Sequence, residues 1–191
     1  MRPLLILLLL TALAWSQDYA GLLKQAQRND PTTDFSALRQ AFSQLPGYNG
    51  YASPPELEPM LKALAAPDLE QAGELARAVL SANYLQLDAH YVLLLWARAH
   101  TNKAEETHHD FMLRGLSAAI RAGHDGSGPE QAWTALNVGE EYSVCRLAGW
   151  RMQSQGLVHQ GARAYDRLNV VNSEGKGFSI YFDITGWFGK L

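Results

Sequence analysis

The stretch Asn83–His100, NYLQLDAHYVLLLWARAH, decides how the rest of this chain must fold. Its centre, Tyr91–Ala97, is apolar without interruption, so a helix formed there carries apolar side chains on nearly every side. Such a helix must be enclosed by other elements. It is too short to cross a bilayer, which needs about 20 apolar residues. The sequence therefore predicts a buried central helix with the rest of the chain packed around it.

Two further helical segments are predicted to clasp this stretch. In Asp68–Ala82, Asp68 is followed three residues later by Gln71, which is the arrangement of a capping box. Lys103–Ala122 is a longer amphipathic segment that ends before Gly123, and a glycine is the typical residue after a helix. The central helix is thus the second helix of one hairpin and the first of another.

The hairpins resemble tetratricopeptide repeats in their length, their short turns and their alternation of small and large residues. The resemblance covers about one and a half repeats, whereas a stable array needs about three or more. Asp88 is predicted to be the N-cap of the central helix. We therefore expect a repeat-like helical hairpin core and not a solenoid.

The sequence predicts helices before this core and an antiparallel sheet after it. Short helices are expected over about 18–28, 34–45 and 56–66. After Gly123 the predicted elements are strands at Gln131–Val138 and Arg151–His159, a helix at Glu140–Ala148, and a β-hairpin made of Ala162–Val171 and Phe178–Thr185. The last of these segments alternates apolar and polar residues, as a half-buried strand does.

These elements define an α+β fold, in which N-terminal and central helical hairpins precede a small antiparallel sheet. A chain of 191 residues fits one domain with a proper core. We expect this domain to cover 17–191, with a helical part at about 18–122 and a sheet-rich part at about 130–187.

Composition and charge exclude some partners. Apolar residues make up 47% of the chain and charged residues 18%, which is typical of a globular protein. The net charge of −3 argues against nucleic acid as a partner, because phosphate binding depends on clustered Lys and Arg. There is also no basic amphipathic segment for a membrane surface.

The N-terminus has the pattern of a signal peptide. Met1-Arg2 is a short basic region and Pro3–Leu13 an apolar region of the usual length. Small residues allow cleavage after Ser16, which we favour, or after Ala14. An uncleaved anchor is the alternative, but the apolar run is shorter than a membrane span. We therefore expect residues 1–16 to be removed and the mature chain to be exported, periplasmic or secreted, without stable membrane insertion.

Familiar catalytic motifs are absent. The chain has no phosphate-binding Walker loop, no GxSxG, no HExxH and no CxxC. Cys145 is the single cysteine, so no intrachain disulfide can form. It could be a nucleophile, but the surrounding residues carry no pattern of one, and a buried structural thiol is the favoured interpretation.

The histidines do not predict a metal site. His108 and His109 are adjacent, so their side chains leave a helix about 100° apart and are not expected to share a metal ion. His108 lies on the apolar stripe of its predicted helix. Glu105 and His109 are one turn apart, but two ligands do not make a zinc site.

One loop resembles the opening of a calcium-binding loop. The pattern of Asp125–Gly128 fails downstream, because Pro129 takes the fifth position and Leu136 stands where a bidentate Glu is needed. An ordinary turn is the simpler interpretation. The sequence thus predicts neither a metal nor another cofactor.

Carboxylates and tyrosines of the second half form the candidate binding site. If Glu140 or Glu141 faced Asp166 across the sheet, the pair could carry out acid–base chemistry, as in glycoside hydrolysis. The alternative is that the two glutamates only favour the start of a helix and that Asp166 lies on a solvated strand face. The candidate residues, expected to line one concave site, are Glu140, Glu141, Tyr165, Asp166 and Tyr181.

Six short segments of the mature chain carry a resemblance: Asp34–Arg39, Asn83–His90, Gly123–Gly126, Glu140–Tyr142, Tyr165–Asp166 and Tyr181–Ile184. Together they resemble a bacterial exported family known as domain of unknown function 4919. This chain has Gly-His-Asp-Gly where the family leads us to expect Gly-Asp-Gly, which adds a residue to that turn. The resemblance implies export and a one-domain layout, and it carries no activity or catalytic residue.

Two functions follow as hypotheses. The repeat-like hairpins and the missing catalytic motifs favour a non-enzymatic module that binds a protein or peptide. The alternative is a small periplasmic hydrolase, or a protein that binds sugar or peptide, using the carboxylates and tyrosines of the second half. An envelope accessory protein without a single ligand is a third possibility that the sequence does not separate from the first.

Overall fold

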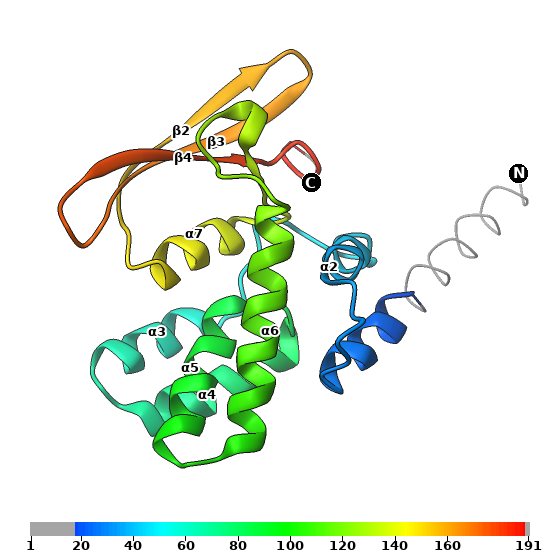
Figure 1. Cartoon of the computed structure of the whole chain (residues 1–191), viewed down its shortest axis with the longest axis vertical. Coiled ribbons are helices and arrows are strands. Elements are labelled where there is room, and N and C mark those ends of the chain that lie inside the picture. Colours follow the sequence, from blue (N-terminus) through cyan, green and yellow to red (C-terminus); the bar gives the residue numbers. More distant parts are fainter. Residues whose placement is uncertain (1–17, 190–191) are drawn as a thin grey trace, which may run out of the picture.

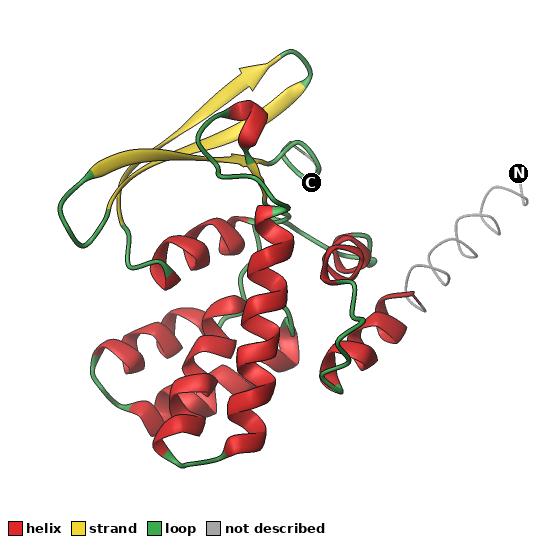
Figure 2. Ribbon diagram, in the orientation of Figure 1, coloured by secondary structure: helices red, strands yellow, loops and turns green. Residues whose placement is uncertain are grey.

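A computed structural model describes residues 18–189 and confirms the α+β fold (Figures 1 and 2). The predicted signal peptide and both cleavage positions lie outside these residues. Residues 18–27 are helical. The helices that follow are α2 (Phe35–Ser43), α3 (Leu57–Ala65), α4 (Leu69–Ala82), α5 (Leu87–Ala99), α6 (Lys103–Arg121) and α7 (Val138–Leu147). Among the described residues, no helix is long and apolar enough to cross a membrane.

The predicted central helix is α5, which lies between α4 and α6 (Figure 1). Eight of its residues are buried, among them Leu94 at 5% exposure and His90 at 0%. Most of its surface is therefore enclosed, as the apolar run of the sequence predicts. The capping box predicted for α4 is also confirmed on its aspartate side, because Asp68 accepts a hydrogen bond from the backbone of Gln71.

The start of α5 differs from the prediction. Gln86, and not Asp88, occupies the cap position, and its side chain makes no capping hydrogen bond. Asp88 lies inside the first turn and is buried. Its carboxylate accepts hydrogen bonds from Ser143 and Arg146 of α7. A residue that favours a helix start is thus used to join two helices.

Four strands form one sheet in the order β1-β4-β3-β2, with the helices on one side of it (Figure 1). The strands β2 (Arg151–Gln160), β3 (Arg163–Val171) and β4 (Gly177–Asp183) are antiparallel neighbours, and the predicted hairpin is confirmed as β3 and β4. The first strand, β1 (Trp133–Thr134), pairs in parallel with β4. The sheet is therefore mixed and not purely antiparallel.

The long strand predicted at Gln131–Val138 is wrong, because its neighbours shorten it from both ends. A single turn of 3-10 helix, η1 (Pro129–Gln131), precedes it. On the other side Asn137 caps α7 by accepting a hydrogen bond from the backbone of Glu140. The backbone N–H of Leu136 donates to the Glu140 carboxylate, so it is not available to a sheet. Only two residues remain for β1.

Buried apolar side chains fall into two clusters. One lies among α3, α4 and α5 and includes Met60, Ala76 and Val92. The other joins α6 and the residues near the N-terminus to the sheet, and includes Leu116 and Phe182. The helical and sheet parts therefore share a core, and α7 lies between them (Figure 1).

The substitution Leu94→Asp tests the placement of the central helix. An unpaired buried charge costs several kcal/mol, out of a total stability of about 5–15 kcal/mol, so we expect this variant to be unfolded. Circular dichroism against temperature checks this. The matched control is Tyr91→Asp on the same helix, because Tyr91 is 37% exposed. A cooperative melt of the Leu94 variant near that of the control would contradict the assignment.

Candidate metal centre

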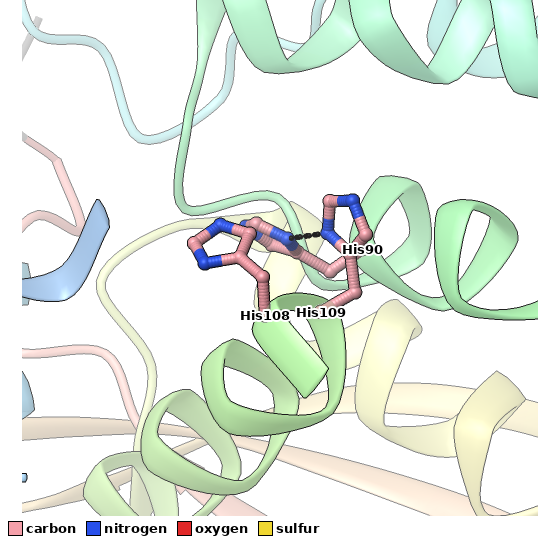
Figure 3. A group of neighbouring side chains, drawn as sticks. All are labelled: His90, His108 and His109. Carbon is pink, nitrogen blue, oxygen red and sulfur yellow. Dashed lines mark hydrogen bonds between the residues drawn. The ribbon is translucent and has the colours of Figure 1, made fainter. Parts of the chain in front are cut away.

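Three histidine side chains meet where α5 packs against α6. His90 lies on α5, and His108 and His109 lie on α6. One imidazole nitrogen from each residue lies within 4.8 Å of the other two (Figure 3). His90 and His109 are buried, and His108 is half-buried. The arrangement brings three potential metal ligands to one point.

The reason for expecting that His108 and His109 would not readily share a metal ion, their divergence on one helix, is contradicted by the structure. The ring centroids of His108 and His109 lie 5.1 Å apart, although the two side chains leave α6 in different directions. Both imidazoles reach toward α5, where His90 lies 5.2 Å from His109 and 6.2 Å from His108 between centroids. The prediction considered one helix alone, whereas the side chains of two helices converge at this interface.

Hydrogen bonds fix which nitrogens carry protons in His90 and His109. The Nε2 of His90 lies 2.8 Å from the carbonyl oxygen of Tyr84, which only accepts, so Nε2–H is the donor. The Nδ1 of neutral His90 then has a free electron pair. It accepts from the Nδ1–H of His109 at 2.9 Å, drawn as the dashed line in Figure 3. The electron pair of neutral His109 is therefore on Nε2.

The third imidazole is held from both sides. The Nδ1 of His108 lies 2.6 Å from the side-chain oxygen of Asn29, so Nδ1–H donates to it. The Nε2 of His108 lies 2.8 Å from the Tyr84 hydroxyl and accepts from it. Tyr84 therefore touches two of the three histidines, one through its carbonyl group and one through its hydroxyl group.

Burial keeps the imidazoles neutral. It lowers the pKa of His90 to about 3, with the neighbouring His109 adding to the effect. Burial also lowers the pKa of His109 to about 4, assisted by His108 and Arg77. The pKa of His108 is lowered by burial too, against the opposing charge of Glu105. Neutral imidazole is the form that binds metal ions.

The donor atoms must move closer together to share one metal ion. Zinc binds imidazole nitrogen at about 2.0–2.1 Å, so neighbouring ligand atoms of a tetrahedron lie about 3.3 Å apart. Here the three candidate nitrogens lie within 4.8 Å of one another. The Nε2 of His108 and the Tyr84 hydroxyl are 2.8 Å apart. To bind one ion together, His90 and His109 must give up their mutual hydrogen bond, because it uses the electron pair on the Nδ1 of His90.

The predicted carboxylate site has a different organisation. Glu140 forms a bidentate ion pair with the guanidinium of Arg39, at 2.9 and 2.7 Å, and both side chains are buried. The same carboxylate accepts from the backbone N–H of Leu136 at 2.7 Å. Arg39 also donates to the Thr134 carbonyl. Glu140 therefore joins α2 to α7. Both of its carboxylate oxygens already accept hydrogen bonds from the protein.

Glu141 and Asp166 do come together, as the acid–base hypothesis requires. Glu141 is completely buried, and its oxygens have no regular hydrogen-bond partner among the described residues, although Asp166 approaches it. Burial, and then the charge of Asp166, raises the pKa of Glu141 to about 9. Asp166 accepts from Gln155 at 2.7 Å, and burial raises its pKa as well. A substrate cannot reach the enclosed Glu141 without a rearrangement of the structure. Glu141 and Asp166 are therefore better explained as two buried carboxyl groups, of which Glu141 holds a proton.

The two tyrosines of the predicted site lie on the other face of the sheet. Tyr165 precedes Asp166 in β3, and adjacent strand residues point to opposite faces. Tyr165 is paired with Asp183 and Tyr181 with Arg167, which places both tyrosines on the face away from Asp166. The five candidate residues are thus divided between two faces and do not line one site.

The buried thiol predicted for Cys145 is confirmed, with 3% exposure. Burial raises the pKa of Cys145 to about 11, and the nearby Glu141 adds to the increase. The thiol therefore remains protonated near neutral pH and is a poor nucleophile.

The histidine cluster left one trace in the sequence. His90 is a polar residue inside an apolar helix, and such a residue needs a buried partner. Because α5 and α6 are predicted to form a hairpin, the partner could have been sought on the second helix of that hairpin, which carries His108 and His109. Asn29 and Tyr84 carry no such signal, because their roles depend on how the helices pack.

Comparison with known proteins places the chain in a family. The model described as Domain of unknown function (DUF4919) matches residues 13–189, so the chain belongs to this family. No curated protein and no solved structure gives a significant match.

Glu141→Gln tests the buried carboxyl pair through the pH dependence of stability. The pKa of Glu141 is about 9 in the folded chain, against an ordinary value of 4.5. Between these values the folded state holds a proton that the unfolded state has released, so this group makes stability fall as pH rises. Glutamine cannot ionise. At pH 8–9 we expect the variant to be more stable by at least about 1 kcal/mol, roughly 2–4 °C in melting temperature for a chain of this size.

The matched control is Glu130→Gln, because Glu130 is exposed. Its stability should follow the wild-type pH profile. Melting curves from pH 5 to 9 in which the Glu141 variant also runs parallel to the wild type would contradict the buried, protonated state of Glu141.

Proposed function

We propose that the mature chain is an exported bacterial protein that binds a divalent transition metal ion on His90, His108 and His109. The observation that carries this proposal is the convergence of three imidazole nitrogens within 4.8 Å of one another. Zinc is the reference metal, because it accepts a set of neutral imidazoles without a strict geometric preference. Copper and nickel also suit imidazole ligands.

The surroundings of the cluster support a metal role. Histidine ligands of metals almost always donate their second ring N–H to an oxygen acceptor, which fixes the ring. The N–H of His90 donates to the Tyr84 carbonyl, and the N–H of His108 donates to Asn29. Two of the three rings are therefore already held in the orientation that a metal ligand needs.

Three histidines leave a fourth position on a tetrahedral ion. The Tyr84 hydroxyl donates to the Nε2 of His108, which is the nitrogen that would bind the ion. Metal binding to this nitrogen must displace the hydroxyl group. Either the displaced hydroxyl or a water molecule would complete the shell, and a water or exchangeable ligand there is typical of sites that also react.

Export is supported by the sequence pattern of residues 1–16. A cleaved chain beginning at Gln17 retains all three histidines, Tyr84 and Asn29. Mass determination of the protein recovered from the periplasm or medium tests the cleavage position. An uncleaved chain in the membrane fraction would contradict this part of the proposal.

Zinc binding tests the central part of the proposal. Calorimetric titration of the chelator-treated chain with zinc chloride should give one ion per chain. Zinc at about one hundred times its dissociation constant should stabilise the fold by about 2.7 kcal/mol. His108→Gln removes a ligand from the half-buried position, and we expect a greater loss of affinity than the roughly 10–100-fold caused by losing an outer hydrogen-bond partner.

The control for this titration is His124→Gln, because His124 is exposed and lies outside the cluster. Its zinc affinity should equal that of the wild type. Equal affinities of the His108 variant and the control, or no binding by the wild type, would overturn the proposal.

A peptide-binding module is the second candidate function. Two hollows of about 300 and 380 Å³ flank the loop before α3 and share Ser53 and Pro54. The larger one is lined by Leu61 of α3 and by Tyr142 and Arg146 of α7, and its apolar side suits an extended peptide with an apolar side chain. A partner that co-purifies with the wild type should be lost with Leu61→Glu and kept with Leu157→Glu, an exposed position of β2. Equal recovery by both variants would contradict this groove.

A further inference from the structure

Asn29 reaches the histidine cluster from a distant part of the chain. It lies in the turn between the first described helix and α2, and its side-chain oxygen accepts from the Nδ1 of His108 at 2.6 Å. The two residues are 79 positions apart in sequence. Asn29 is therefore the direct hydrogen-bonded link between this turn and the three imidazoles.

The turn holds Asn29 in a defined conformation. Its φ of 56° lies in the left-handed region, which asparagine and aspartate tolerate better than other residues that carry a side chain. The backbone N–H of Asn29 donates to Ala26, which is fully buried. The next residue, Asp30, accepts hydrogen bonds from the backbone and the hydroxyl group of Thr32. The acceptor that faces His108 is thus carried by an ordered loop.

The contact decides which nitrogen of His108 faces the cluster. With Nδ1–H held by Asn29, the electron pair lies on Nε2, and Nε2 is the atom directed at the Tyr84 hydroxyl. Because His108 is only half-buried, packing alone restrains its ring less than the rings of His90 and His109. Without Asn29 the proton can move to the other nitrogen and the ring can turn.

We propose that Asn29 is a positioning residue for metal binding, and that metal binding in turn fastens the 28–33 turn to α6. The proposal rests on the metal function proposed above. A metal ion on Nε2 draws electron density from the ring and strengthens the hydrogen bond from Nδ1–H to the Asn29 oxygen. By linkage, whatever factor the docked turn adds to metal affinity, the metal adds to the docking of the turn.

Substitution at Asn29 separates the acceptor from the backbone. Glycine keeps the positive φ but removes the acceptor, whereas aspartate keeps both. We expect Asn29→Gly to lower zinc affinity about 10–100-fold and Asn29→Asp to restore it to the wild-type range or above. The control is Thr32→Ala, which alters the same turn without touching His108.

A structural role alone would not give this pattern. Melting without metal shows how far each variant disturbs the fold, and zinc affinities are compared only after that. The visible spectrum of cobalt(II), used as a probe for zinc, should shift for the glycine variant and match the wild type for the aspartate variant. Equal zinc affinity of the wild type and Asn29→Gly would overturn the role of Asn29 and leave the three-histidine site intact.

Hydrogen exchange tests whether metal binding fastens the 28–33 turn to α6. Adding zinc should slow amide exchange in residues 28–33 of the wild type and leave these rates unchanged in Asn29→Gly at a zinc concentration that saturates both. Amide exchange rates in this turn of the wild type that do not change when zinc is added would overturn the coupling. A wild type that binds no zinc at all would overturn the metal function itself.

Discussion

The buried carboxylate of Asp88 is the constraint on which the arrangement of this molecule depends. It lies on the central helix and is 3% exposed, so its charge must be matched inside the protein. Ser143 and Arg146 of α7 supply the match. Separating α7 from α5 would leave the buried Asp88 carboxylate without these partners, although Arg146 itself is partly exposed. Three of the four strands follow α7 in sequence, and β2 packs against it, so this contact helps to set how the helical and sheet parts meet.

The same rule of buried polar groups explains why the histidine cluster is satisfied whereas, within residues 18–189, the carboxyl group of Glu141 is not. The three histidines supply one another, Tyr84 and Asn29 with donors and acceptors, so burial leaves them neutral and paired. Glu141 has no comparable partner and holds its proton instead. A set of neutral, oriented nitrogen donors is ready for a metal ion, whereas a protonated acid inside the core is not. This difference is why the metal proposal rests on the α5–α6 interface and not on the carboxylates of α7 and β3.

Patterns within single elements allowed most of the fold to be predicted. The apolar run of α5, the length of α6 and the alternation in β4 each depend on one segment, and all three were visible in the sequence. Features that depend on which segments pack against each other could not be predicted in this way. Asp88 has the right type and place for an N-cap, but the approach of Arg146 gives it another role. The predicted strand before α7 is cut to two residues because Glu140 takes the N–H of Leu136. The histidine cluster was missed for the same reason, since the angle between His108 and His109 on one helix says nothing about a third ring on its neighbour.

X-ray absorption at the zinc edge of the loaded protein tests the central claim most directly, because it reports the ligands and not only the affinity. Three imidazole nitrogens on α5 and α6 predict a shell at about 2.0–2.1 Å with the outer scattering of three histidine rings. The fourth ligand should fit one oxygen atom, from Tyr84 or water. A shell dominated by oxygen, with the scattering of one imidazole or none, would show that zinc binds elsewhere and would contradict the three-histidine centre.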